Sequence, residues 1–168
     1  YEFALGNGRL KLIGLQSYEH SPFTNDFTRA SAATGSILSG SRFVRTANEG
    51  ESVVRAEYGW PGNGGEWQIA LEGAYNFLDI TSALDTYSTS GRLTPVDLAG
   101  ANTFVDEWRS ELMVTRGWTL APGVTLQTTA GGEYSRIRQT SAGGLSRSFW
   151  RPKGTAAPTS RFFWPGAL

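Results

Sequence analysis

The sequence predicts an all-β protein, an antiparallel meander of long strands, and three observations lead to this fold class. Apolar and polar residues alternate with a period of two along most of the chain, whereas an apolar period of about 3.6 residues is almost absent. Turn segments rich in glycine separate the alternating stretches, and the chain holds 21 glycines. Aromatic residues make up 12% of the chain, which suits strands better than helices.

The turn segments divide the chain into about seven or eight strands, joined by connections that alternate between short and long. The predicted elements, in order, are a strand end at 1–5, a turn at 6–8, a strand at 9–20, a polar connection at 21–36, a strand at 40–60 in which Asn48-Glu49-Gly50 could form a bulge or break, a turn at 61–65, a strand at 66–79, a long connection at 80–102, a strand at 103–118, a turn at 120–123, a strand at 124–138 and a last strand from Leu145. Bacterial outer-membrane barrels have short turns at the periplasmic rim and longer loops at the extracellular rim. The alternation therefore favours a membrane barrel over a soluble sheet.

The spacing of aromatic residues also favours a membrane barrel. Three strands carry, on one face, a row of small or apolar residues that spans ten positions, at 67–77, 108–118 and 124–134. Five of the six ends of these rows are aromatic. Ten residues at about 3.3 Å each, tilted by about 40°, rise about 25 Å, which is the height of the apolar band between aromatic girdles. We therefore expect an open partial transmembrane β-barrel of about seven or eight strands.

The two faces of these strands define two sets of candidate residues. The set expected to face lipid, as aromatic girdles, is Tyr58, Trp60, Trp67, Tyr75, Phe77, Trp108, Trp118 and Tyr134. The tryptophans at 60, 67 and 118 are expected near the periplasmic rim, and Tyr75, Phe77, Trp108 and Tyr134 near the other rim. The opposite face carries charges at mid-strand, which a wet lumen permits and a packed core forbids. The set expected to face the lumen is Arg55, Glu57, Glu72, Arg109, Glu111 and Glu133.

The composition excludes several functional classes. The chain has no cysteine and one histidine, His20, which excludes thiolate and multi-histidine metal sites. Basic and acidic residues number fifteen each, and no basic patch points to nucleic acid. The glycine-rich segments 62–65 and 142–144 precede no predicted helix that could bind phosphate, and the acidic pair Asp106-Glu107 lacks a base or nucleophile. We expect no enzymatic activity, no cofactor, no metal and no nucleic-acid partner.

Several stretches resemble barrel strands of TonB-dependent outer-membrane receptors, especially of the alphaproteobacterial type. The resemblance is carried by GRLKLIGLQSYEHSPF at 8–23, GSRFVRTANEGESVVRAEYGW at 40–60, GEWQIALEGAYNFLD at 65–79 and LAPGVTLQTTAGGEYSRIRQTSAGGLSRSFWRPKG at 120–154. In this family a signal peptide, a TonB box and a globular plug domain precede a barrel of about 22 strands. Nothing in residues 1–168 matches those three preceding parts, so the resemblance implies an internal fragment of the barrel domain. After Gly154 the pattern fades, and Pro158 and Pro165 predict that residues 155–168 are irregular.

The resemblance implies a function in the bacterial outer membrane, namely uptake of a scarce ligand energised by TonB in the full-length protein. The ligand would be a siderophore, another metal chelate or an oligosaccharide, and no residue can be assigned to it. The implied partners are outer-membrane lipid, the plug domain and TonB.

Two alternatives remain open. One is a small closed eight-stranded barrel with a structural role. The other is a soluble β-sandwich that binds carbohydrate through Trp60, Trp67 and Trp150. Two parallel aromatic belts would favour the membrane, one cluster would favour a binding face, and burial between two sheets would favour a sandwich. A fragment of a larger barrel should form an open, curved sheet with unpaired edges.

Overall fold

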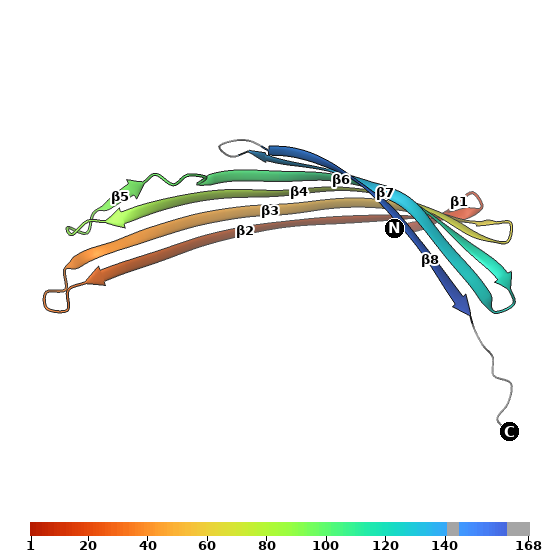
Figure 1. Cartoon of the computed structure of the whole chain (residues 1–168), viewed down its shortest axis with the longest axis horizontal. Coiled ribbons are helices and arrows are strands. Elements are labelled where there is room, and N and C mark those ends of the chain that lie inside the picture. Colours follow the sequence, from red (N-terminus) through yellow and green to blue (C-terminus); the bar gives the residue numbers. More distant parts are fainter. Residues whose placement is uncertain (141–144, 161–168) are drawn as a thin grey trace, which may run out of the picture.

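A computed structural model describes residues 1–140 and 145–160 as a single antiparallel sheet (Figure 1). The strands are β1 (Glu2–Leu5), β2 (Gly8–Ala30), β3 (Ile37–Gly62), β4 (Gly65–Tyr87), β5 (Leu93–Val96), β6 (Asn102–Ala121), β7 (Val124–Thr140) and β8 (Leu145–Ser160). Their order is β1-β2-β3-β4-β6-β7-β8, and the short β5 pairs with the end of β4. Within the described residues, no helix is long and apolar enough to cross a membrane. The predicted all-β antiparallel meander is confirmed.

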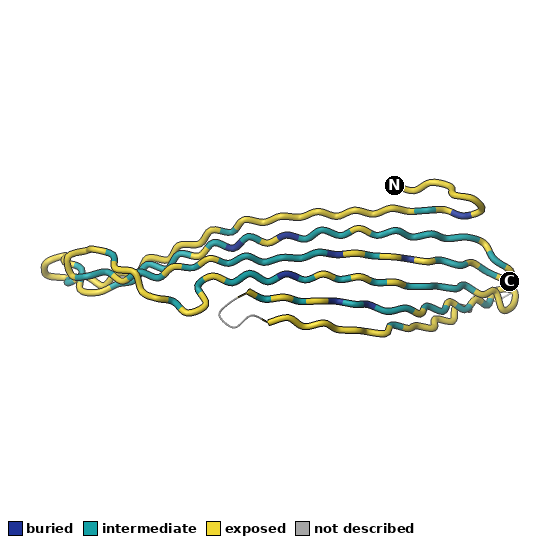
Figure 2. Tube along the Cα trace, turned by 90° about the horizontal axis from the view of Figure 1, so that it is seen from above, coloured by how far each residue is buried: buried dark blue, intermediate teal, exposed yellow. Residues whose placement is uncertain are grey.

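The sheet is an open arch in one layer, as seen from the edge in Figure 1 and from above in Figure 2. β1 covers only residues 8–11 of β2, so most of that long strand has a free edge. The outer edge of β8 has no strand beside it in the described part of the chain. The predicted open sheet is therefore confirmed. The alternative of a closed eight-stranded barrel is wrong, because the first and last strands do not pair.

Short turns lie at one end of the sheet and longer connections at the other, as predicted (Figure 1). Two-residue turns at 6–7, 63–64 and 122–123 define the end that we name the turn end. Each of these turns has a glycine with positive φ, the conformation that a tight hairpin requires. The connections at 31–36 and 88–101 lie at the opposite end, named the loop end.

Several strands run further than the sequence predicted. β2 continues to Ala30 and so occupies most of the predicted connection at 21–36, β3 begins at Ile37, and β4 continues to Tyr87. No bulge or break occurs at 48–50, where β3 stays in register with β2 and β4. His20, the last residue of the strand predicted at 9–20, lies inside β2 opposite Asn48. Backbone pairing holds these segments as strands, although polar side chains are more frequent in them than in the rest of the sheet.

The last strand also corrects a prediction. β8 extends to Ser160, so residues 155–160 are regular, and Pro158 pairs with Leu126. β8 is an edge strand, where a missing N–H can be tolerated. The remainder of the predicted irregular segment, residues 161–168 with Pro165, lies outside the described residues.

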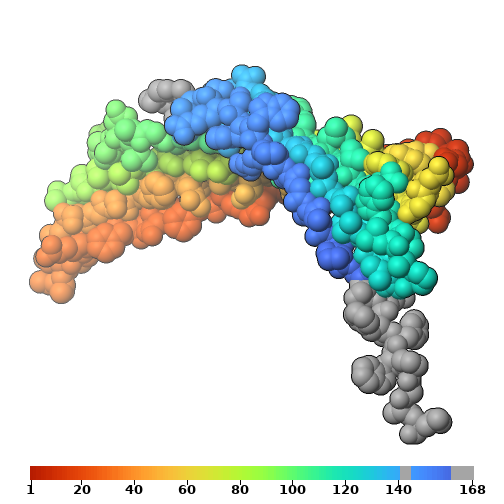
Figure 3. All heavy atoms as spheres, turned by 45° about the vertical axis from the view of Figure 1, so that its right-hand side comes forward, coloured from red at the N-terminus to blue at the C-terminus, as the bar shows by residue number. Residues whose placement is uncertain are grey.

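Alternation along the strands gives the sheet two unlike faces. On the face named the apolar face, Val54, Leu71 and Leu112 are 67%, 56% and 48% exposed. The opposite face is named the polar face, and the space-filling view in Figure 3 shows the arch of the sheet. Small side chains on the polar face, such as Ala70 and Ala74, are buried because longer neighbours crowd over them. The sheet thus has large apolar side chains open to its surroundings.

Candidate functional site

An aromatic group lies on the apolar face at the turn end of the sheet. Tyr58 stacks on Trp60 with ring centroids 5.3 Å apart, and Trp60 stacks on Trp67 at 6.3 Å. The guanidinium of Arg116 lies 4.4 Å from the ring centre of Trp67 and 3.7 Å from that of Trp118. These four aromatic residues form the turn-end band, and Arg116 bridges two of them by cation–π contacts.

A second aromatic group lies on the same face near the middle of the long strands. Tyr75 contacts Trp108 with ring centroids 4.6 Å apart, and Tyr134 contacts Trp150 at 5.2 Å. The loop-end band consists of Tyr18, Tyr75, Phe77, Trp108, Tyr134 and Trp150. All eight aromatic residues predicted as girdles thus lie on one face in two bands. They are not enclosed between two sheets, as the β-sandwich alternative required.

The sequence reasoning missed Tyr18 and Trp150 as members of the loop-end band. A signal for Trp150 was present, because antiparallel pairing of the last two predicted strands places it directly opposite Tyr134. Tyr18 lies on β2, where the residue ten positions nearer the turn end is Gly8 and not an aromatic residue. Its ring lies 6.5 Å from that of Phe77.

The two bands step across the sheet in the same direction. Tyr18 on β2 is level with Ser146 on β8, but Trp150 lies four residues nearer the turn end, five strand spacings away. At about 3.3 Å per residue and about 4.8 Å per spacing, this step corresponds to a tilt of about 30°. The turn-end band descends in the same sense from Trp67 to Trp118. Strands in closed barrels tilt by about 35–45°, so bands that step in this way would be nearly level in a tilted wall.

Beyond the loop-end band, the apolar face of β2, β3 and β4 becomes polar, whereas the opposite face there carries apolar side chains such as Phe23, Phe43 and Leu84. On the apolar side there, Arg42 Nε lies 3.0 Å from Asp26 Oδ2, and the Tyr87 hydroxyl donates a hydrogen bond of 2.8 Å to Asp26 Oδ1. The hydrogen bond from Tyr87, followed by that from Arg42, lowers the pKa of the Asp26 carboxyl below its ordinary value. The same hydrogen bond raises the pKa of the Tyr87 hydroxyl.

We expect Tyr87→Phe to raise the pKa of Asp26 toward its ordinary value of 3.8, because the hydrogen bond from the Tyr87 hydroxyl to the ionised carboxylate is lost. The pKa of Asp26 is lower in the folded state than in the unfolded state. The stabilisation by the ionised carboxylate is therefore fully present above the unfolded-state pKa, and it is lost as the pH falls through the folded-state pKa. An NMR titration of the Asp26 carboxyl carbon measures the change. Thr94→Val, at the same end of the sheet, is the control and should leave the midpoint in place.

Ion pairs cross the polar face from strand to strand. Lys11 on β2 lies 3.8 Å from Glu57 on β3, and Arg55 lies 2.7 Å from the same carboxylate. Arg55 also contacts Glu72 on β4 at 3.2 Å, and Arg109 on β6 reaches Glu72 at 3.0 Å. Glu57 and Glu72 therefore each contact two basic side chains. Four of the six residues predicted to face a lumen belong to this chain of contacts.

The remaining two predicted residues form a second cluster. Glu111 on β6 lies directly opposite Glu133 on β7, and Lys153 Nζ contacts both carboxylates, that of Glu133 at 2.8 Å. Arg151 also contacts Glu133, at 3.1 Å. Lys153 reaches from β8 across β7 to β6 by passing over Gly131, its register partner. The sequence reasoning missed Lys11, Lys153 and Arg151, because contacts across two or three strands require the register.

We expect Gly131→Ala to destabilise the sheet by about 1–3 kcal/mol, the usual cost of overpacking. A Cβ at Gly131 would overlap the carbonyl oxygen of Leu112 and come within 2.9 Å of the Cα of Met113. Gly132→Ala is the matched control on the other face, where the nearest atom to the new Cβ is the Arg151 carbonyl oxygen at 3.6 Å. Urea unfolding of the two variants measures the difference, and equal stability would contradict the crowding at residue 131.

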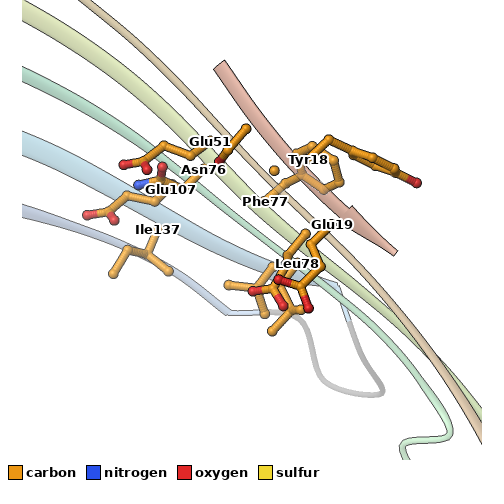
Figure 4. A pocket seen from close by; sticks show the side chains of 12 residues that line it. Tyr18, Glu19, Glu51, Asn76, Phe77, Leu78, Glu107 and Ile137 are labelled. Atoms are coloured by element: carbon orange, nitrogen blue, oxygen red, sulfur yellow. The ribbon is translucent and has the colours of Figure 1, made fainter. Parts of the chain in front are cut away.

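The polar face also has a hollow of about 550 Å³ toward the loop end (Figure 4). Figure 4 shows Glu51 and Glu107 on one side of the sheet and Tyr18 projecting to the other. Glu19 and Glu49 face each other across β2 and β3 at the margin of the hollow. The described residues contain no group of three or more acidic, histidine or cysteine side chains arranged to hold a metal ion. The hollow is an open, acidic surface.

No model of a known protein family matches the chain, and no curated protein sequence matches it.

Proposed function

We propose that this chain forms part of the wall of a bacterial outer-membrane β-barrel. The observation that carries the proposal is the pair of aromatic bands on one face, ten residues apart on β4 and on β6. At about 3.3 Å per residue and a tilt of about 30–40°, that separation matches an apolar layer of about 25 Å. The charged side chains gathered on the opposite face would line a wet lumen.

The open edges support a barrel that contains further strands. β2 and β8 leave backbone groups unpaired along their outer edges within the described residues, and unpaired groups cannot face lipid. Ion pairs and exposed carboxylates on the polar face require water, which a wide barrel admits and a narrow, side-chain-filled barrel excludes. A wide barrel completed by additional strands satisfies both requirements.

Within outer-membrane barrels, we propose a receptor of the TonB-dependent type. The four stretches at 8–23, 40–60, 65–79 and 120–154 support this assignment by their resemblance to that family. The function that follows is uptake of a siderophore, another metal chelate or an oligosaccharide. In such a receptor the energy would come from TonB through a plug domain inside the barrel.

Membrane placement is tested by two neighbouring cysteine substitutions, because the chain has no cysteine of its own. Leu71→Cys on the apolar face should resist a water-soluble maleimide in membranes of cells that produce the protein. Glu72→Cys, on the polar face, should react. Equal and rapid labelling of both would contradict membrane placement, and detergent solubilisation should make the thiol of the Leu71→Cys variant reactive.

Transport is tested separately in cells that lack the gene. Uptake of radioactive ferric siderophores, cobalamin and maltodextrins is measured with and without the gene, and again after loss of TonB. A receptor of this type gives uptake of one of these probes that requires both the gene and TonB. Uptake that requires the gene but not TonB would point to a passive pore.

A further inference from the structure

An apolar hollow lies on the apolar face over β4, β6, β7 and β8. It measures about 340 Å³, and its floor on this face is formed by Leu71, Leu112, Val114 and Gly132. Tyr134 and Trp150 stand at its loop-end side, and Trp150 is 76% exposed. The hollow exists because residue 132 has no side chain, and a Cβ there would meet only the Arg151 carbonyl oxygen, at 3.6 Å.

Two arginines follow the hollow along the same face of β7. Arg138 forms an ion pair of 2.5 Å with Asp106, which is 2% exposed, so the charge of Arg138 is balanced by a neighbouring carboxylate. Arg136 is exposed, and the described part of the chain offers it no ion pair or hydrogen bond. Its register neighbours are Trp108 on β6 and Ser148 on β8. A free guanidinium therefore stands among the aromatic residues of the loop-end band.

The turn-end band presents no such charge. Its arginine, Arg116, lies between the rings of Trp67 and Trp118, and its Nη2 donates to the carbonyl oxygen of Asn63 at 3.1 Å. The two ends of the apolar layer therefore differ. One arginine is held by its neighbours, whereas Arg136 remains available to an external anion.

We propose that the hollow and Arg136 together bind a membrane lipid with an anionic phosphate head group. One acyl chain would lie in the hollow at Gly132, and the phosphate would accept hydrogen bonds from Arg136, four residues or about 13 Å further along β7. Guanidinium groups match phosphate oxygens in geometry and charge. Aromatic side chains such as Tyr134 and Trp150 suit the boundary between acyl chains and head groups. This inference rests on the proposed placement of the apolar face in a membrane.

The test uses the full chain in phosphatidylcholine vesicles that contain a minor fraction of lipid brominated on its acyl chains. Bromine quenches nearby tryptophans, and Trp108 and Trp150 lie beside the site. Phosphatidylglycerol carries a net negative charge, whereas the choline of phosphatidylcholine neutralises its phosphate. Brominated phosphatidylglycerol should therefore bind about tenfold more tightly than brominated phosphatidylcholine, as one additional charge-assisted contact would give. Arg136→Gln should bring that ratio to about one. Gly132→Leu, which fills the hollow, should do the same without removing a charge.

Arg147→Gln is the matched control, since Arg147 lies on the polar face of β8 and should leave the preference unchanged. Equal quenching by both lipids in the unaltered chain would overturn the lipid site while leaving the membrane placement intact. No quenching by either lipid would overturn both. Loss of the preference for phosphatidylglycerol in Arg147→Gln would show that the preference comes from the overall charge of the protein. Competition by inorganic phosphate alone would show a site for free anions. Either result overturns the proposal.

Discussion

Lys153→Met is expected to lower the free energy of unfolding by about 1–3 kcal/mol. The ammonium group of Lys153 is the shared partner of Glu111 and Glu133, which lie directly opposite each other on neighbouring strands. Glu133 is 5% exposed, so water can do little to replace the lost contact. Like charges directly opposite each other destabilise a strand pair. The partial exposure of Lys153 itself keeps the expected loss below that of a fully buried pair.

A second substitution distinguishes this electrostatic effect from a packing effect. Adding Glu111→Gln to Lys153→Met removes the repulsion and should restore part of the stability. Arg147→Met is the control, because Arg147 lies on the same strand and face and has no ion-pair partner among residues 1–140 and 145–160. Urea unfolding in detergent, followed by tryptophan fluorescence, measures all three. A loss in the control as large as in Lys153→Met, or no recovery in the double variant, contradicts the role of Lys153.

Leu112→Arg is expected to destabilise the protein by about 2–4 kcal/mol in a phospholipid bilayer, the cost of an arginine near the midplane on a lipid-facing strand. Leu112 lies between the two aromatic bands and is 48% exposed on the apolar face. In lipid that exposed surface would be covered by acyl chains, where a guanidinium has no partner. The size of the effect follows from depth, so it should shrink for substitutions near either band.

The matched control for Leu112→Arg is Gln68→Arg on the polar face of β4. The same charge enters there beside water and should change the stability little. Unfolding by urea is measured for both variants in vesicles of phosphatidylcholine. Equal stability of the two variants in vesicles would remove the reason to assign the apolar face to lipid.

The two faces of the sheet could be predicted from sequence because alternation with a period of two is a local property. Leu71 and Glu72 are assigned to opposite faces as soon as their strand is recognised, and each neighbouring residue follows. The turns were equally local, since asparagine and glycine at 63–64 determine a tight hairpin. The antiparallel pairing at the turn end followed from turns too short for a parallel connection.

The outer parts of β2, β3 and β4 could not be predicted in this way. Residues 21–30 and 80–87 are rich in polar and turn-forming side chains, with few apolar residues such as Phe23 and Leu84 among them, so their sequence suggests a loop. Backbone pairing with neighbouring strands nevertheless holds them in register. The contact of Lys153 with Glu111 was also beyond reach. It depends on a glycine at residue 131 that lets a side chain pass over an entire strand.

The unequal lengths of the strands give the loop end an uneven height. From the level of Tyr18, β3 continues through Gly50 to Ile37, about 13 residues or roughly 40 Å. From the level of Trp108, β6 ends at Asn102, after about 6 residues or roughly 20 Å. If the apolar face lies in a membrane, β2, β3 and β4 extend far beyond the membrane surface, whereas β6 ends close to it. A large particle approaching the surface would meet protein first above β2 to β4, whereas above β6 to β8 it could come close to the lipid itself.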